Sequence, residues 1–374
     1  VAACLHVTAE TANLVRALIA GGARVGLCAA NPLSTQDDVA AALTERDGAT
    51  VLAERGESAK RYAEHVQTLV ASAPRVTIDD GADLIGAIHE ADAAQAAEML
   101  GGTEETTAGL LRVRAMAERG VLACPVLAVN ESRTERAFND RFGTGQSTID
   151  GILRATNLLL AGRTVVVFGY GWTGRGVALR ARGAGASVIV CEVDPLRALE
   201  ARMEGYEVMG ALAAAERGDV FVTVTGGRDV LRREHFERMK DGAVLANAGH
   251  FDVEIKLEDL RGLAVGGRRE VLPLVEEHRF ADGRRLNLLA QGRVVNLAAG
   301  EGHPAAVMDV SFAAQALCVE YLVACAGELQ PRVLPVPDRI DDDVARLKLE
   351  SLGIEIDELN EDQRVYRSSW EQGA

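Results

Sequence analysis

The sequence predicts an α/β protein with two doubly wound, Rossmann-like domains, a hinge between them and a C-terminal helical arm. Short apolar runs alternate with longer amphipathic stretches from residue 1 to about residue 130, as in a parallel sheet covered by helices. A second strand, turn and helix unit begins in mid-chain. With 374 residues, 48% of them apolar, the chain can bury two cores. We place the first domain at residues 1–144, completed by 303–330, the second at 145–302 and the arm at 331–374.

Polar residues gather where the expected strands of the first domain end. In an open parallel sheet, ligands bind at these carboxyl ends. Some of these residues also fit as helix caps or turns, such as Ser34, Asp83 and the turn at 79–81. The expected strands are Ala2–Val7, Val25–Ala29, Thr50–Ala53, Arg75–Asp79 and Val126–Asn130, and the expected helices are Ala9–Ala20, Gln36–Thr44, Ala59–Ala73, Asp83–Met99 and Gly109–Arg119.

The segment from Thr164 to Asp194 predicts a dinucleotide site. Its apolar run ends at Gly169, Gly171 and Gly174, which permit a tight turn, close approach to a pyrophosphate and packing of the next helix on the strand. The phosphates would then lie at a helix N-terminus. A glycine-rich turn in an unrelated strand and helix unit is the alternative, but the flanking strand, the helix and the acid that follows favour dinucleotide binding.

A second strand, Ser187–Cys191, ends in Glu192, whose carboxylate can accept both ribose hydroxyls of NAD and would repel the phosphate of NADP. We therefore predict NAD as the cofactor. Further strands are expected at Phe221–Thr225, Ala243–Ala246 and Val294–Asn296. Helices over 147–160 and 304–326 would cross between the domains and form the hinge.

Charge and cysteine usage exclude several kinds of partner. The formal net charge of -15 and the lack of a basic stripe disfavour nucleic acid and anionic membranes. We found no signal peptide and no apolar stretch of the length that a membrane span requires. The six cysteines lie in apolar segments without metal-ligand spacing, which predicts buried thiols, no bound metal and a cytoplasmic location.

The tail predicts an arm for contact with other subunits. Prolines precede a helix with Ile340, Val344 and Leu347 on one face, and a final helix has Asn360 as its cap with Gln363 three residues on. A plain pair of surface helices is the alternative.

Several phrases together resemble the S-adenosylhomocysteine hydrolase family over nearly the whole chain, in the shorter form typical of bacteria and thermophiles. Beside the NAD turn, they are CLHVTAET at 4–11, NPLSTQDDVAAAL at 31–43, DDGADL at 79–84, GGTEETTAG at 101–109, GQSTIDGILRATN at 145–157, MEGYEV at 203–208, NAGHFDVEI at 247–255 and VVNLAAGEGHPAAVMDVSF at 294–312.

The resemblance implies oxidation of a ribose 3'-hydroxyl by bound NAD, removal of the C4' proton, loss of the 5' substituent, addition of water and return of the hydride. It implies a homotetramer and an adenine nucleoside substrate. It also assigns roles, with catalytic His6, Asp80, Glu105, Glu135, Asn139 and His250, nucleoside contacts from Leu5, Thr8, Glu10, Asn130, His303 and Met308, and NAD contacts from Thr106, Thr107, Asp140, Gly169, Gly171, Trp172, Thr173, Gly174, Glu192, Thr225 and Asn296.

One segment departs from the family pattern. The family reads N-D-x-x-T-K-x-x-F-D-N, whereas this chain has Glu135 at the lysine, Asn139 at the aspartate and Asp140 at the final asparagine. Residues 135 and 139 are one helical turn apart and would face the same edge of the substrate. Replacing a cation by a carboxyl group removes a stabiliser of alkoxide and adds a possible acid or base.

Three functions are compatible with this departure. The first is a diverged nucleoside dehydratase or lyase of the kind that tailors nucleoside antibiotics, which we favour because the other site residues are kept. The second is an ordinary S-adenosyl-L-homocysteine hydrolase that yields adenosine and homocysteine. The third is a catalytically silent NAD-binding regulator.

Overall fold

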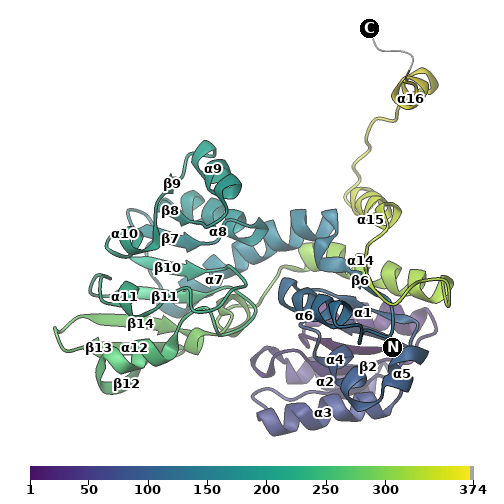
Figure 1. Cartoon of the computed structure of the whole chain (residues 1–374), viewed down its shortest axis with the longest axis horizontal. Coiled ribbons are helices and arrows are strands. Elements are labelled where there is room, and N and C mark those ends of the chain that lie inside the picture. Colours follow the sequence, from purple (N-terminus) through teal and green to yellow (C-terminus); the bar gives the residue numbers. More distant parts are fainter. Residues whose placement is uncertain (371–374) are drawn as a thin grey trace.

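The computed structural model describes residues 1–370 as two α/β units joined by helices, with a C-terminal segment that projects from the first unit (Figure 1). Each unit is built on its own sheet, one of seven strands and one of eight. The predicted fold class is confirmed, because each sheet has a parallel core that is covered by helices.

The first sheet has the order β15-β6-β5-β4-β1-β2-β3, with every neighbouring pair parallel. The chain runs outward from β1 in one direction and then continues from β4 in the other, so the winding reverses between these two strands. A ligand crevice forms at such a reversal. The strands are β1 Ala2–Leu5, β2 Gly26–Ala29, β3 Thr50–Leu52, β4 Val76–Asp79, β5 Gly101–Glu104, β6 Val126–Ala128 and β15 Val333–Pro335.

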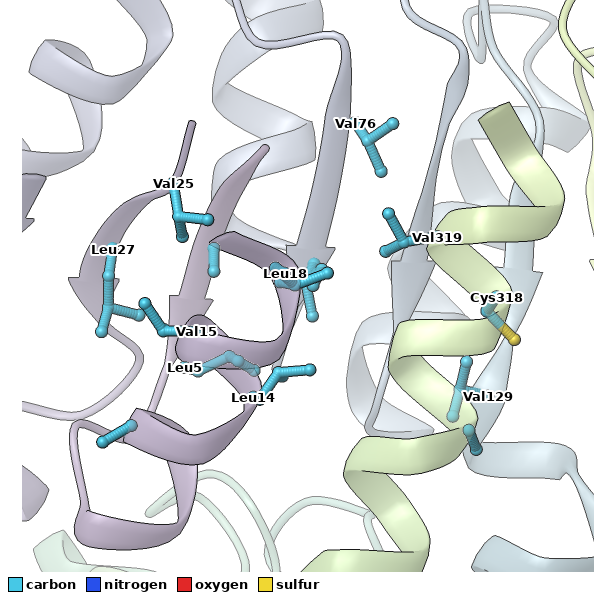
Figure 2. Packing of buried hydrophobic residues seen from close by; sticks show 14 of the residues in the cluster. Leu5, Leu14, Val15, Leu18, Val25, Leu27, Val76, Val129, Cys318 and Val319 are labelled. Carbon is cyan, nitrogen blue, oxygen red and sulfur yellow. The ribbon is translucent and has the colours of Figure 1, made fainter. Parts of the chain in front are cut away.

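Helices cover both faces of this sheet. The helix α14 and helix α1 pack on one face, where Leu14 and Leu18 of α1 share a core with Val319 of α14 (Figure 2). By length and composition α14 could span a membrane, a possibility that the sequence analysis missed, but its apolar side chains contribute to this core. The helices of the unit are α1 Ala9–Ala20, α2 Asp37–Glu45, α3 Ala59–Ala71, α4 Asp83–Ala91, α5 Ala93–Glu98, α6 Thr107–Glu118 and α14 Ala305–Ala324.

The second sheet has the order β12-β13-β14-β11-β10-β7-β8-β9, and its winding reverses between β7 and β10. Strands β12, β13 and β14 form an antiparallel edge that periodicity did not predict. The strands are β7 Thr164–Phe168, β8 Ser187–Cys191, β9 Glu207–Val208, β10 Val220–Thr223, β11 Ala243–Asn247, β12 Ala264–Leu272, β13 Val275–Phe280 and β14 Arg285–Leu289, and the helices are α8 Trp172–Gly183, α9 Pro195–Met203, α10 Ala211–Ala215, α11 Arg233–Phe236, α12 Leu257–Leu263 and α13 Val295–Ala298.

Some expected elements differ from the structure. The strand expected at Val294–Asn296 is wrong, since α13 occupies this segment and only Val294 bridges to β11. Strand β5 was missed because its sequence, Gly-Gly-Thr-Glu, has low strand propensity. There, a Cβ on Gly102 would lie 2.5 Å from the Thr77 hydroxyl oxygen, so glycine permits close packing of β5 on β4. The helix expected over 83–99 is split where Asp92 caps α5.

The connection between the units is helical. A π-helix, η3 (Glu135–Thr144), runs directly into α7 (Gly145–Thr156). Helix α8 packs on η3 at very short range, because a Cβ on Gly176 would lie 2.0 Å from the Arg141 carbonyl oxygen. Side chains larger than hydrogen are therefore excluded at this point of contact.

The C-terminal segment is divided between the first unit and solvent. Strand β15 adds to the first sheet, and α15 (Asp338–Ser351) contributes Ile340 and Val344 to its core. Asp341 on α15 is 4% exposed and accepts hydrogen bonds from the backbone and hydroxyl groups of Thr134. Strand β15 and α15 of the expected arm thus pack on the first unit, whereas residues 352–370, with α16 (Glu361–Ser368), extend away (Figure 1). Contact of the arm with other subunits stays a prediction.

Candidate active site

A cavity of about 1100 Å³ lies between the two units. It brings together residues from the carboxyl ends of β1, β4 and β5, from η3, from the turn after β7 and from the start of α14. Every residue predicted for the site lines this cavity except Gly174. Segments that are far apart in the sequence therefore meet at one place.

The three glycines of the turn after β7 have different environments. Gly169 has a φ of +98°, which favours glycine. A Cβ on Gly174 would lie 2.0 Å from the Gly169 carbonyl oxygen, so this residue holds the helix against the turn and does not face the cavity. A Cβ on Gly171 would approach nothing more closely than the Arg197 side chain, at 3.7 Å, so there is open space at the start of α8. These environments fit a bound pyrophosphate.

The end of β8 places a carboxylate on the same side of the cavity. Glu192 accepts hydrogen bonds from the backbone amides of Tyr170, at 2.6 Å, and Val193, at 2.7 Å. After β10, on the other side of β7, the backbone and hydroxyl groups of Thr225 donate to Glu254. Glu192 is thus oriented by the backbone before any ligand binds, as recognition of a ribose diol requires.

On the first unit, an aspartate lies between two histidines. The Asp80 carboxylate is 3.2 Å from His6 Nε2 and 3.6 Å from His250 Nδ1. Burial alone would raise the pKa of Asp80, but attraction to His6, and then to His250 and His303, lowers it below its usual value. His6 is in turn hydrogen-bonded through Nδ1 to Ser34, at 2.6 Å. Asp80 is therefore held as a carboxylate at neutral pH.

The segment after α13 supplies a further histidine. Nε2 of His303 is 2.9 Å from the Thr144 hydroxyl, and burial lowers the pKa of His303 to about 4. Burial also lowers the pKa of His250. Both rings are thus favoured in the neutral form near Asp80. Asn296 is tied to the connecting helix α7, because its amide donates to the Ser147 hydroxyl at 3.2 Å.

Glu105, at the end of β5, is held by helix α14. Its two carboxylate oxygens accept from the Ser311 hydroxyl and from the Gln315 amide. The Asn139 amide donates to the same serine, at 3.1 Å, and lies 3.5 Å from Glu105. Burial raises the pKa of Glu105, although these donors oppose the shift.

The π-helix places Glu135, Asn139 and Asp140 together. Five residues are about 1.4 turns of an α-helix, which would separate 135 from 140, whereas i to i+5 is the hydrogen-bonding repeat of a π-helix. The expectation that residues 135 and 139 share a face is extended to residue 140. Burial, Glu105 and Asp140 raise the pKa of Glu135 well above its usual value, and burial and Glu105 raise that of Asp140 to about 7.

Some predicted ligand contacts also have a structural role. Thr8 and Thr106 cap helices α1 and α6 through their hydroxyl groups. The Thr107 hydroxyl donates to the Asn130 side chain, at 2.9 Å. The remaining predicted residues, Leu5, Glu10, Trp172, Thr173 and Met308, lie in the cavity wall.

Sequence reasoning missed Ser311 and Gln315, which are 1% and 0% exposed and orient Glu105. They are four residues apart on a mostly apolar helix, a spacing that places both on one face. Buried polar side chains at this spacing were the available signal, because such groups require partners.

The fold and the cavity define a two-domain, NAD-binding protein whose cavity is lined by acids and histidines. Two family models match the chain, "S-adenosyl-L-homocysteine hydrolase" over residues 1–99 and "S-adenosyl-L-homocysteine hydrolase, NAD binding domain" over residues 140–302. The chain belongs to the S-adenosyl-L-homocysteine hydrolase family. The prediction of NAD is confirmed by the second match.

Named relatives match over the full chain. The adenosylhomocysteinase of Aquifex aeolicus is 59% identical, with 100% of this chain and 89% of the relative covered. That of Thermococcus kodakarensis is 54% identical, over 100% and 88%. The S-inosyl-L-homocysteine hydrolase of Methanopyrus kandleri is 53% identical, over 99% and 87%.

These relatives overturn one prediction. The diverged dehydratase for antibiotic tailoring is wrong, because proteins named as hydrolases match the whole chain at 53–59% identity. The departure of residues 135, 139 and 140 from the family pattern stays a prediction.

Proposed function

We propose that this protein hydrolyses S-adenosyl-L-homocysteine to adenosine and homocysteine. The main support is the single cavity, in which the dinucleotide turn of one unit faces the Asp80 cluster of the other. Relatives named adenosylhomocysteinase that are 59% and 54% identical also support it.

The residues present fit NAD as a resident cofactor. Gly171 leaves space for the pyrophosphate, Glu192 would accept the ribose hydroxyls, and Thr225 and Asn296 lie on the wall that would face the rest of the molecule. Bound NAD supplies a reversible hydride acceptor for the 3'-carbon of the nucleoside.

Within this proposal, Asp80 removes the C4' proton once the 3'-carbon is a ketone. The ketone acidifies the neighbouring hydrogen, and a carboxylate fixed between His6 and His250 is placed to accept it. The neutral His250 and His303 would position the 5' substituent and the water that replaces it. After water adds at C5', the same Asp80 would return the proton to C4', before the 3'-ketone is reduced.

Hydrolysis of S-inosyl-L-homocysteine is the second candidate, because the Methanopyrus kandleri relative carries that name at 53% identity. The two substrates differ only in the purine base. A cytoplasmic homotetramer belongs to the same proposal, and the free state of all six cysteines is consistent with a reducing compartment.

The test is to assay the purified protein with both nucleosides and to identify the products by mass spectrometry. We expect release of homocysteine and recovery of NAD, not NADP, from the denatured protein. If neither substrate yields homocysteine while NAD is bound, the proposed function is wrong and the silent-regulator alternative gains support.

A further inference from the structure

Four carboxyl groups line one part of the cavity. Glu135 and Asp140 come from η3, Glu105 from the end of β5 and Asp80 from the end of β4. The cluster lies between the cofactor side and the nucleoside side of the cavity. Asp140 is within hydrogen-bonding reach of Thr173 at the start of α8, and Glu105 is close enough to Asp80 for their charges to repel. A substrate hydroxyl that is to be oxidised must lie in this region, within reach of both the cofactor and the nucleoside site.

The two glutamates of the cluster have unequal hydrogen bonding. Glu105 accepts at both oxygens, from Ser311 and Gln315, which favours its ionised form. Glu135 is 2% exposed, and its Oε2 atom has no hydrogen-bond partner among residues 1–370. The two carboxyl groups lie within hydrogen-bonding reach of each other. Glu135 is thus the member of the pair with capacity to hold a proton and to accept a further partner.

The groups that face this pair from the surrounding elements are neutral or acidic. From η3 it is faced by Asn139 and Asp140, from β4 by Asp80, and from α14 by Ser311, Gln315 and the Cys318 thiol. Arg136, also on η3, acts on Asp140 and lies 3.5 Å from Glu131. Among the ion pairs of residues 1–370, none includes Glu105 or Glu135. Two adjacent buried carboxylates cannot both ionise, so one retains a proton.

We propose that Glu135 and Glu105 share one proton and that this pair accepts and returns the proton of the ribose 3'-hydroxyl. The inference rests on the proposed function. As the C3'–H bond breaks and the hydride passes to bound NAD, the O–H bond also breaks, its proton moves to the pair, and the carbonyl forms. The singly protonated pair becomes doubly protonated. When the hydride returns to C3', the same proton returns to the oxygen, so protons and electrons balance.

The test is infrared difference spectroscopy of the NAD-loaded full chain at neutral pH, compared with Glu135→Gln. We expect a band of a buried protonated carboxyl that the variant lacks and that the matched control Glu207→Gln retains. Glu207 is an exposed glutamate paired with Arg217, outside the cavity wall. In the wild type, adenosine should shift this band and 3'-deoxyadenosine should not. This comparison uses no variant and holds even if Glu135→Gln fails to fold.

Hydrolysis gives the second readout. Glu135→Gln should retain NAD and slow turnover by about 10²–10⁴-fold, the usual contribution of an acid–base group. A band that persists in Glu135→Gln, or that responds equally to both nucleosides, would overturn the shared proton, as would full activity of the variant. If the wild type hydrolyses neither S-adenosyl-L-homocysteine nor S-inosyl-L-homocysteine but the band behaves as expected, the proposed function is wrong and the proposal of a protonated pair stands.

Discussion

The two sides of the cavity are built in different ways. The cofactor side relies on backbone, with glycines that permit close approach and a carboxylate, Glu192, held by neighbouring amides. The nucleoside side relies on side chains from distant segments, such as Asp80 with His6 and Glu105 with Ser311. A backbone site should tolerate most changes but not added volume at the glycines. A side-chain network should instead be sensitive to loss of a single charge or proton.

The largest expected effect is on the nucleoside side. Asp80→Asn keeps the shape of the side chain but removes the carboxylate that contacts His6 and His250. We expect turnover to fall by about 10²–10⁴-fold with little change in NAD retention. Steady-state assays and quantification of released NAD measure the two effects separately. Loss of NAD in this variant would mean that the two sides are not independent.

The matching change on the cofactor side is Gly174→Ala. Its Cβ would lie 2.0 Å from the Gly169 carbonyl oxygen, so the turn or the helix must move, at a cost of about 1–3 kcal/mol. NAD affinity should fall roughly 10- to 100-fold. Trp172, 41% exposed in the cavity wall, offers a fluorescence signal for the titration. Gly183→Ala, on the same helix with nothing within 4 Å of its Cβ, is the control and should bind NAD normally.

The acidic cluster should also affect stability as the pH changes. Burial and Glu105 raise the pKa of Asp140 to about 7, above the value of about 3.9 in an unfolded chain. Because the folded protein binds the proton more tightly, this stability is complete below pH ~4 and is lost as the pH rises to about 7. Asp140→Asn should remove this loss, which is roughly 1.4 kcal/mol per pH unit.

Urea unfolding of the wild type and Asp140→Asn between pH 4 and 7 measures the difference. Asp241→Asn is the control, since Arg285 lowers the pKa of Asp241 to about 2 and the stability that Asp241 contributes is nearly constant above pH ~5 and is lost only at lower pH. Parallel curves for the wild type and Asp140→Asn would mean that Asp140 is ionised in the folded protein.

The smallest expected effect concerns the choice of cofactor. Glu192→Ala removes the carboxylate expected to accept the ribose hydroxyls, which should weaken NAD by about tenfold, the value of one charge-assisted hydrogen bond. NADP affinity should rise or stay unchanged, because the repulsion is removed. Competitive titration of the two dinucleotides checks this, and an unchanged preference for NAD would assign the discrimination to other residues.

What the sequence alone determined is mostly local. The glycine spacing, the strand ends and the family phrases identified the parallel sheets, NAD and a set of site residues that all line the cavity except Gly174, because each depends on neighbours close in the chain. It did not predict β5, whose glycines are explained only by tertiary contacts, those of Gly102 with Thr77 on β4 and those of Gly101 with Pro125 and with Leu322 on α14.

Only the tertiary structure decided how the acids of the site interact. The π-helix brings Asp140 beside Glu135, and α14, more than 170 residues further on, supplies the partners of Glu105. The expectation that Glu135 stands where the family has a lysine led to a wrong prediction of the function. A carboxyl group has no fixed charge until its surroundings are known, since burial and neighbouring acids determine whether it keeps its proton.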